Sequence, residues 1–521
     1  MKTAVVIYFV LLSLSLYGQG RTDSIVAIPA HSTGPTSSGT REHVSANDEK
    51  FTTTAGSTFV SFSLIEKKRG KAVSINVGLN MAMRGFNRFV LEDEYAQINL
   101  GSMRNNMNTL PVWDTNRFTT NLAGHPYHGS MYFNSARANG FEFYQSSLVT
   151  AAGSLMWEYL METKPPSHND LWATTVGGAA LGEVLFRWSD LILDNRTTGL
   201  ERAGRELLAG ILSPTRLISR LINGEAWKTG QFRGNILYMP PYLLELYSGE
   251  TMTVVHGTDA NLWSTTLGTG LQYGEQFGVL IEKPYEWFQT TGEAMIGNEG
   301  FHLTQVSILG PLFNKALFHN EETWITGGLF QHFNYYDIKK TGNNNNNNNN
   351  NSTTTLYISE AAAVGPGVIV LKKKSEVKTQ FGAHLSGIIL GASTSDHFKL
   401  EDRDYNFGSG FSLKLSSSFQ FRQKLLFALY AENYMLFSWK GVNDYEKLKN
   451  LTTDEIDFLN VQGDKSRVRL HLLGLNMKYR LNENTHLIFR ARHFTRHTMY
   501  KYFPNVDHNS DEFFFGIGMY V

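Results

Sequence analysis

The chain has 521 residues, with 47 Lys and Arg against 47 Asp and Glu, so its formal net charge is zero. Proteins that bind nucleic acids usually carry a basic excess, so we expect no nucleic-acid partner. The chain contains no Cys, which excludes disulfides, a thiol nucleophile and a metal held by Cys. Aromatic residues reach 13% while charged residues are only 18%. This balance is typical of transmembrane strands with aromatic girdles, and the alternative is a large soluble β-protein.

The first 20 residues are predicted to be a signal peptide. Lys2 precedes an apolar run at 4–17, and Gly18 or Gly20 offers a small residue for cleavage. This run is too short to cross a bilayer stably, so we predict that the chain is exported. Residues 21–56 are rich in Ser, Thr, Gly and His, and we expect a disordered periplasmic lead-in.

Residues 57–230 are predicted to form a mostly helical module. Its early segment 72–84 is ambiguous, because the apolar residues alternate strictly, which favours a strand. The spacing of Ile75, Leu79 and Phe86 also fits one face of a helix. Periodicity alone therefore leaves both structures open for this segment.

A helix start is predicted at Ser167, where the pattern Ser-x-x-Asp reaches Asp170 directly after two prolines. The helix that follows can run to about Asp194. Several charged residues of the module recur at i,i+4 spacing, which puts them on a common helix face. Buried charges are costly unless they are paired, so we predict structural ion pairs. The alternative is an ion pathway or a catalytic acid/base pair. The predicted ion-pair residues are Arg137, Glu183, Arg187, Asp190, Arg202 and Glu206.

Residues 231–521 are predicted to form a transmembrane β-barrel. The connections alternate between long and short when counted from the C-terminus, as in outer-membrane barrels with long outer loops and short periplasmic turns. An even number of strands places both barrel ends, and the helical module, on the periplasmic side. We therefore predict an antiparallel outer-membrane barrel of about twelve strands, preceded by a helical block that plugs or caps its periplasmic side. The predicted strands are 234–249, 258–274, 278–296, 300–319, 322–339, 353–373, 378–394, 405–421, 424–440, 466–481, 485–500 and 511–521.

One strand indicates which residues face the lumen. In 485–500, Leu487, Phe489 and Ala491 alternate with a basic set that we expect to point inward. Two carboxylates on the predicted strand 278–296 share a face and are expected to help neutralise this basic row. The predicted lumen-facing residues are Glu282, Glu286, Arg490, Arg492 and Arg496.

The loops and the last strand add two further expectations. Residues 343–351 are nine consecutive Asn, which we interpret as a disordered outer loop. The alternation at 511–521 resembles the terminal strand recognised by barrel-assembly machinery, although the last residue is Val rather than an aromatic. That machinery and the lipids of the outer membrane are therefore expected partners.

The helical module holds the residues with possible chemistry. His125 and His128 flank Pro126-Tyr127, and two His at this spacing can ligate one metal if carboxylates join them. The alternatives are a general base, or a polar turn that packs helices against the barrel. The sequence defines no third ligand and no Gly-x-Ser-x-Gly motif, so we predict no metal site and leave the cofactor unknown. The candidate catalytic residues are His125, His128, Glu158, Glu162, Asp170 and Glu183.

The helical module contains a series of short motifs over roughly residues 70–222. They are PVWDTN at 111–116, HPYHGS at 125–130, YFNSARANG at 132–140, GSLMWEY at 153–159, PPSHNDL at 165–171 and TTVGGAALGE at 174–183. In these motifs the module resembles an uncharacterised family of outer-membrane barrel proteins from Gram-negative bacteria. The resemblance implies helices attached to a barrel, and so a helix at 72–95. The family is a domain of unknown function, so the resemblance implies a fold and a location but no reaction.

Two functions follow from these patterns. The first is a gated or plugged pore, or a binding protein of the cell envelope, favoured by the barrel and by the basic lumenal face. The second is an enzyme that modifies lipid or lipopolysaccharide, with His125 or His128 as base and a nearby carboxylate as partner. A subunit of a larger envelope complex is a third possibility.

Overall fold

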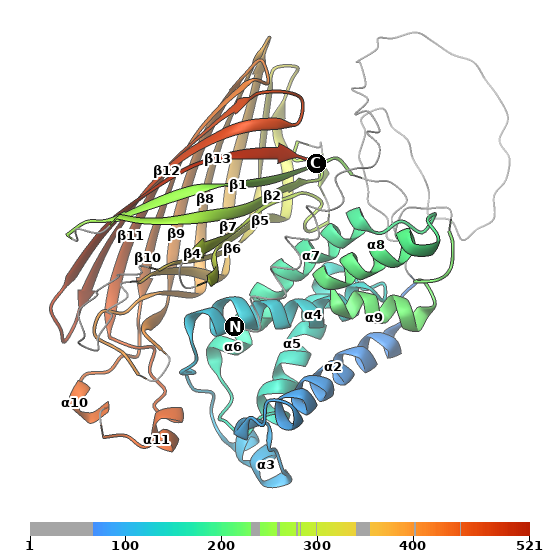
Figure 1. Ribbon diagram of the computed structural model, residues 1–521. Helices are drawn as coiled ribbons and strands as arrows, with labels where there is room; N and C mark the ends of the chain where they lie inside the picture. The colour runs from blue at the N-terminus through green and yellow to red at the C-terminus, as the bar shows by residue number, and fades with distance from the viewer. Residues whose placement is uncertain are drawn as a thin grey trace.

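The computed structural model describes residues 66–230 and 240–521, apart from 258–260, 278–279, 282, 298–299, 340–354, 401–402 and 449. It consists of a helical block followed by a closed β-barrel, and Figure 1 shows the two lying side by side. The predicted signal peptide, the lead-in, the nine-Asn run and Glu282 lie outside the described residues. No helix in the described part of the chain is long and apolar enough to cross a membrane.

The helical block is built around α4. Gly129 of α4 approaches η3 and α7 so closely that an added Cβ would lie 1.9 Å from the carbonyl oxygen of Thr174. The ambiguous segment 72–84 is helical and buries Ile75 and Asn76. The elements of the block are α2 (Arg69–Phe89), η1 (Glu94–Ala96), α3 (Leu100–Asn108), η2 (Thr120–Gly124), α4 (His125–Arg137), α5 (Phe143–Leu160), α6 (His168–Trp172), η3 (Ala173–Gly177), α7 (Gly178–Ile192), α8 (Gly199–Leu212) and α9 (Pro214–Asn223).

The helix predicted to start at Ser167 is confirmed. The Ser167 hydroxyl oxygen accepts a hydrogen bond from the backbone N–H of Asp170 at 3.3 Å, which satisfies one of the free N–H groups at the helix start. The chain then stays helical through α6, η3 and α7 to Ile192. Both η2 and η3 are single π-helical turns, a feature that is frequent at functional sites.

Twelve long antiparallel strands close into the barrel, as predicted. The sheet closes because β1 pairs with β13 and β5 pairs with β6, while the short β3 adds to β5. The strands are β1 (Tyr242–Val255), β2 (Asn261–Tyr273), β3 (Leu280–Ile281), β4 (Phe288–Gly297), β5 (Gly300–His319), β6 (Thr323–Lys339), β7 (Thr355–Lys374), β8 (Val377–Thr394), β9 (Tyr405–Phe421), β10 (Leu425–Phe437), β11 (Ser466–Arg480), β12 (Thr485–Tyr500) and β13 (Val506–Tyr520). Two short helices, α10 (Tyr445–Leu448) and α11 (Thr453–Asp457), lie in the long connection after β10.

Two of the predicted strands differ clearly from the structure, and β13 also begins five residues before the predicted position 511. Of the first strand, predicted at 234–249, residues 234–239 lie outside the described residues. The described strand β1 ends at Val255, six residues later than predicted, because its pairing with β13 extends that far. The single strand predicted at 278–296 is divided into β3 and β4 by a bend that contains Tyr285 at a φ of 57°. A positive φ of this kind interrupts an extended strand.

Contacts across the lumen distinguish the inside of the barrel from the outside. Glu293 on β4 binds Arg492 on β12 at 2.8 Å and also pairs with Arg490, although three strands separate β4 from β12 in the sheet. Such a contact is possible only across the interior. Arg490 and Arg492 therefore point inward, as does Arg496, whose partner is Asp396 at 2.7 Å.

The acidic partners of this basic row differ from the prediction. Glu286 lies in the bend before β4 rather than on a strand. The carboxylates that pair with the row are Glu293, Glu512 and Asp396. The error follows from the division of 278–296, because the bend breaks the alternation that was used to place Glu282 and Glu286 on one face.

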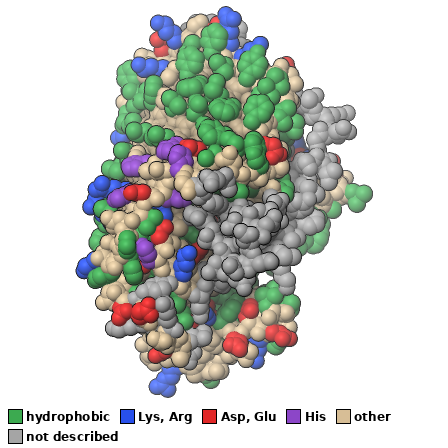
Figure 2. Space-filling model, turned by 60° about the vertical axis from the view of Figure 1, so that its left-hand side comes forward, with side chains coloured by type: hydrophobic (Ala, Val, Ile, Leu, Met, Phe, Trp, Pro, Cys, Tyr) green, Lys and Arg blue, Asp and Glu red, His purple; other side chains and the backbone are tan. Residues whose placement is uncertain are grey.

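The outward side chains form an apolar belt. Phe489, Phe513, Phe515 and Ile517 alternate with the inward residues and are 37% to 64% exposed. Figure 2 shows hydrophobic side chains gathered over one end of the molecule. In bilayer hydrocarbon every backbone polar group must be satisfied internally, and a closed barrel with an outer apolar belt meets this need. The protein is therefore an outer-membrane β-barrel.

The helical block packs against the outside of this barrel. Phe118 stacks on Tyr357 of β7 with ring centroids 4.2 Å apart, and Phe143 stacks on Tyr285 at 5.2 Å. Gln331 of β6 donates to the carbonyl oxygen of Val176 at 2.9 Å. The even-numbered residues of β6, such as Tyr336 and Ile338, face the lumen. Gln331 is odd-numbered and therefore faces the outer wall. The block is thus joined to the outer wall by a shared core.

The predicted plug or periplasmic cap is therefore not the arrangement that is observed. The block extends along the wall to the end of the barrel that carries the long connections, where Arg403 donates to the carbonyl oxygen of Asp114 at 2.6 Å. Lys164 and Asp457 of α11 form an ion pair at 3.1 Å. The physical reason is that side chains of the barrel itself occupy its interior, where residues of β6 and β12, on opposite walls, belong to one buried cluster.

Replacing Gly249 by Ala is expected to weaken the seam between β1 and β13. An added Cβ would lie 2.3 Å from the carbonyl oxygen of Phe515, and overpacking of this kind costs about 1–3 kcal/mol. The measurement is the temperature at which the folded band disappears on SDS gels. Gly292→Ala is the control, because its added Cβ would meet Thr269 at an ordinary 3.5 Å. Equal melting of the two variants would contradict the geometry of the seam.

Candidate functional site

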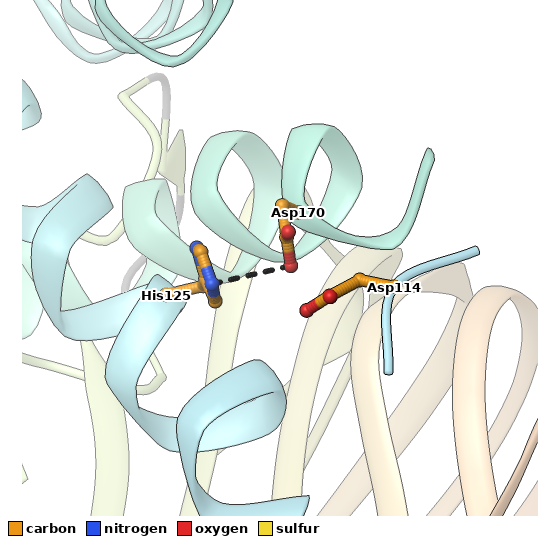
Figure 3. A group of neighbouring side chains, drawn as sticks. All are labelled: Asp114, His125 and Asp170. Atoms are coloured by element: carbon orange, nitrogen blue, oxygen red, sulfur yellow. Dashed lines mark ion pairs between the residues drawn. The ribbon is translucent and has the colours of Figure 1, made fainter. Parts of the chain in front are cut away.

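Three side chains from different parts of the block converge near the barrel. Asp114 lies in the extended segment before η2, His125 begins α4, and Asp170 lies in α6. One ligand atom from each lies within 4.8 Å of the other two. Figure 3 shows the three side chains directed toward one another. The shortest contact joins His125 Nε2 to Asp170 Oδ1 at 3.2 Å.

Backbone pairing brings these segments together. Val112 donates to the carbonyl oxygen of Pro166 at 2.8 Å and accepts from the N–H of His168 at 2.8 Å. The Asn169 side chain accepts from the N–H of Asp114 at 2.9 Å. The segment that carries Asp114 is thereby fixed to the start of α6.

Neutral donors orient the two carboxylates. Asp114 accepts from the N–H of Thr115 at 2.6 Å and from the Asn116 amide at 2.5 Å. Asp170 accepts from the Asn169 amide at 2.8 Å and from the Ser167 hydroxyl. Hydrogen bonds of this kind fix ligand orientation in metal sites, so the carboxylates are held in place before any ligand arrives.

The imidazole of His125 is held from both sides. Its Nδ1 lies 3.4 Å from the hydroxyl of Thr174, and its Nε2 faces Asp170. If Nδ1 carries the proton, then Nε2 presents a lone pair to a carboxylate. In that tautomer a cation can bind between Nε2 and the carboxylate, whereas with the proton on Nε2 the ring donates a hydrogen bond to Asp170. His125 can therefore either pair with Asp170 or act as a ligand together with it.

Two further carboxylates lie behind this group. Burial raises the pKa of Glu158 well above its usual range, with a further increase from Asp170, and burial and the neighbouring Glu158 raise the pKa of Glu162 in the same direction. Burial also raises the pKa of Asp170 to about 6, although His125 acts in the opposite direction. Four carboxyl groups thus lie close together beside His125. Glu158 and Asp170 are buried, whereas Asp114 and Glu162 are partly buried. The raised pKa values mean that Glu158 and Glu162 retain a proton more readily than ordinary carboxyl groups do.

The other candidates lie apart from this group. Burial, and to a lesser extent the charge of His125, lower the pKa of His128 to about 3, and its ring packs against Tyr132 at 4.5 Å and Trp157 at 5.2 Å. Glu183 is held by Arg137 at 2.6 Å and by Arg187 at 2.8 Å. His128 therefore sits in an aromatic environment, and Glu183 belongs to a separate ion-pair cluster.

The remaining residues of the predicted ion pairs also have charged partners. Asp190 pairs with Arg216 of α9. Arg202 pairs with Glu206 at 3.0 Å, and Glu206 also pairs with Arg220 at 2.8 Å. These contacts join α7, α8 and α9 through buried charge.

Asp114 is the site residue that sequence reasoning missed. It lies more than fifty residues before Asp170, and spacing along the chain gave no reason to connect the two. The available signal was the segment PVWDTN at 111–116, which shares the family resemblance. Its acidic residue follows an apolar stretch and precedes η2.

Residues 110–215 match the family described as "Domain of unknown function (DUF3943)". This segment contains Asp114, His125 and Asp170. The chain is similar to that family over this segment. No curated protein matches the sequence.

Among solved structures, the barrel is similar to the NanC porin, with 10% identity over 53% of this chain and 98% of that chain, at a TM-score of 0.24. It is also similar to the toluene transporter TodX of Pseudomonas putida, with 8% identity over 54% of this chain and 88% of that chain, at a TM-score of 0.21. OmpT of Vibrio cholerae shares 7% identity over 55% of this chain and 100% of that chain, at a TM-score of 0.22.

Replacing Glu162 by Gln is expected to stabilise the helical block at pH 8 and to have little effect at pH 5. The pKa of Glu162 is raised by folding, so the folded state takes up a proton that the unfolded state has lost. Its favourable contribution is therefore present at low pH and is lost as the pH rises. Thermal unfolding followed by circular dichroism at 222 nm measures the effect. A change of 1 kcal/mol in the free energy of unfolding should shift the melting temperature by about 2–4 °C.

The matched control is Glu201→Gln, because Glu201 is exposed and pairs with Arg205 on the surface of α8. That variant should show the wild-type dependence of stability on pH. If Glu162→Gln melts at the wild-type temperature at both pH values, folding does not raise the pKa of Glu162 and the prediction is wrong.

Proposed function

We propose that the helical block binds a divalent cation at Asp114, His125 and Asp170, and that the barrel anchors this block in the outer membrane. The observation that supports the proposal is the convergence of one imidazole nitrogen and two carboxylate oxygens within 4.8 Å. A cation there would bind the Nε2 lone pair and both carboxylates, and it would favour the ionised forms of the two Asp side chains.

The donor set indicates the class of cation. One imidazole and two carboxylates suit Zn²⁺ or Mn²⁺ better than a soft metal, since the chain has no Cys. The Thr174 hydroxyl near Nδ1 would act as the outer partner that fixes the ring, as is common for metal-bound His. Three protein ligands leave positions open for water or for a substrate oxygen.

An enzyme that uses a free His as general base is supported less well. Both ring nitrogens of His125 face protein groups, and His128 is enclosed by aromatic rings. A general base must reach the proton of its substrate. A lipid- or lipopolysaccharide-modifying activity would therefore depend on the cation and its bound water rather than on a free imidazole.

The test is a titration of chelator-treated, detergent-solubilised protein with Zn²⁺ and with Mn²⁺ by isothermal calorimetry. We expect about one cation per chain, and an affinity that falls about 10- to 100-fold or more in His125→Ala and in Asp114→Asn. The control is His168→Ala. This His is near the site in the chain, but its ring packs against Trp113 at 5.7 Å and is not one of the three proposed ligands.

All variants in this titration should carry His256→Ala and His493→Ala. These two residues both contact Asp511 at 2.6 Å on the outer wall of the barrel and offer a second place for a cation. If the parent protein in this background binds no cation, or if His125→Ala binds as tightly as the parent, the proposed site is wrong.

A pore that is closed at rest is the second candidate function. It is supported by the ion pairs of Glu293 with Arg490 and Arg492, and by the apolar cluster that joins opposite walls of the lumen. Charged side chains that line and cross a lumen are also a known means of gating. In this candidate the gate consists of barrel side chains rather than of the helical block.

Conductance in planar bilayers tests this candidate. Wild-type protein should show little steady conductance, and the triple variant Glu293→Ser, Arg490→Ser, Arg492→Ser should conduct more because three crossing side chains are shortened. Glu250→Ser, an exposed change on β1, is the control. A wild-type barrel that is open at rest would contradict the closed lumen.

A further inference from the structure

The hairpin formed by α8 and α9 has its polar and apolar faces reversed. Its buried residues include Arg202, Glu206, Arg216 and Arg220. Most of its exposed side chains are large and apolar, and Glu201 at the start of α8 is an exposed charged residue. In a helix packed on a water-soluble protein, the apolar stripe faces the core and the charged residues face solvent. The exposed apolar residues of the hairpin are Leu200, Leu207, Ile218, Leu221 and Ile222, which are 38% to 92% exposed.

Each buried charge of the hairpin has a charged partner, so the reversed faces are a stable feature of the block. Arg220 binds both Glu206 at 2.8 Å and Glu225 at 3.3 Å. Arg202 donates to the carbonyl oxygens of Asp194 at 2.7 Å and Ala226 at 3.1 Å. The inner face of the hairpin is therefore fixed by charge, and rotation of either helix would break this network.

We propose that the exposed face of this hairpin contacts the acyl chains of the outer-membrane lipids beside the barrel. A row of leucines and isoleucines is stable against hydrocarbon, whereas a contiguous apolar face is unfavourable in water. The same helices bury their arginines, as helices in contact with lipid do.

The helical block is continuous with the lipid-facing belt of the barrel. The hydroxyl of Tyr144 on α5 donates to the carbonyl oxygen of Leu312 on β5, and the next residue, Phe313, is exposed in the belt. On β6 the belt residue Leu329 is followed two positions later by Gln331, which binds the block. The lipid that covers the belt therefore meets the block directly.

The position of the hairpin in the chain agrees with a membrane contact. It lies shortly before β1, whose first residue, Tyr242, enters the wall at the end of the barrel that carries the short turns. Trp227 and Lys228 follow α9 and are exposed, and such residues are common at the membrane–water interface. The α8–α7 contact in turn connects the hairpin to Tyr273 of β2, which lies near Arg187.

The absence of Cys makes a clean test possible, because each substitution then introduces one labelling site. Full-length Ile218→Cys and Ile222→Cys are labelled with the fluorophore NBD and reconstituted into liposomes of phosphatidylcholine, with and without bromine on the acyl chains. Leu473→Cys in the belt is the positive control, and Lys440→Cys in the long connection after β10 is the negative control.

We expect brominated lipid to reduce the fluorescence at positions 218 and 222 as much as at position 473, with blue-shifted emission at all three. Position 440 should show neither effect. If labels at 218 and 222 match the label at 440, or are shielded from water without bromine quenching, the lipid contact is wrong. The second of these results would point to a protein partner on this face.

Discussion

The rest of the structure depends on the closure of the sheet by the β1–β13 pair. In bilayer hydrocarbon an unpaired strand edge is too costly to persist, so the barrel must be continuous. Closure requires close approach at Gly249 and Gly516, where side chains would meet the partner backbone. Once the sheet is closed, alternation along each strand assigns side chains to the lumen or to the outer wall, apart from the register shifts between β4 and β9. The crossing ion pairs of Glu293 and the belt around Phe515 are two results of the same constraint.

The outer wall then has two different neighbours. One part faces lipid, and another part is the docking surface for the helical block. The candidate site lies where the block meets a barrel loop. Arg403 binds the backbone of Asp114, and Tyr405 binds the backbone of Asn116 at 2.9 Å. The barrel thus does more than hold the block at the membrane, since it also positions the segment that carries one of the three site residues.

Much of the barrel could be predicted from local alternation, because inward and outward positions differ in chemistry at every second residue. The division of 278–296 could not, since it depends on a positive φ at Tyr285 that no composition signal reveals. The position of the block could not be predicted either. Loop-length parity gives the side on which the chain ends lie, but it carries no information about packing on the wall. Within the site, His125 and Asp170 were identified by type, whereas Asp114 is brought to them by hydrogen bonds between its segment and the start of α6, which the sequence does not reveal.

The helical block contains two kinds of charged cluster, and the contrast between them supports the proposed cation site. Glu183 is held between two arginines, and Glu206 is also held between two. In these clusters the carboxylate charge is neutralised by arginines of the fold, so no bound ligand is needed to balance it. The carboxylates of Asp114 and Asp170 instead have amides, a hydroxyl and a backbone N–H as hydrogen-bond donors, beside one imidazole. Neutral donors orient a carboxylate without cancelling its charge, and Arg403 donates to the backbone carbonyl oxygen of Asp114 rather than to its carboxylate. The two carboxylates therefore remain available to the proposed cation.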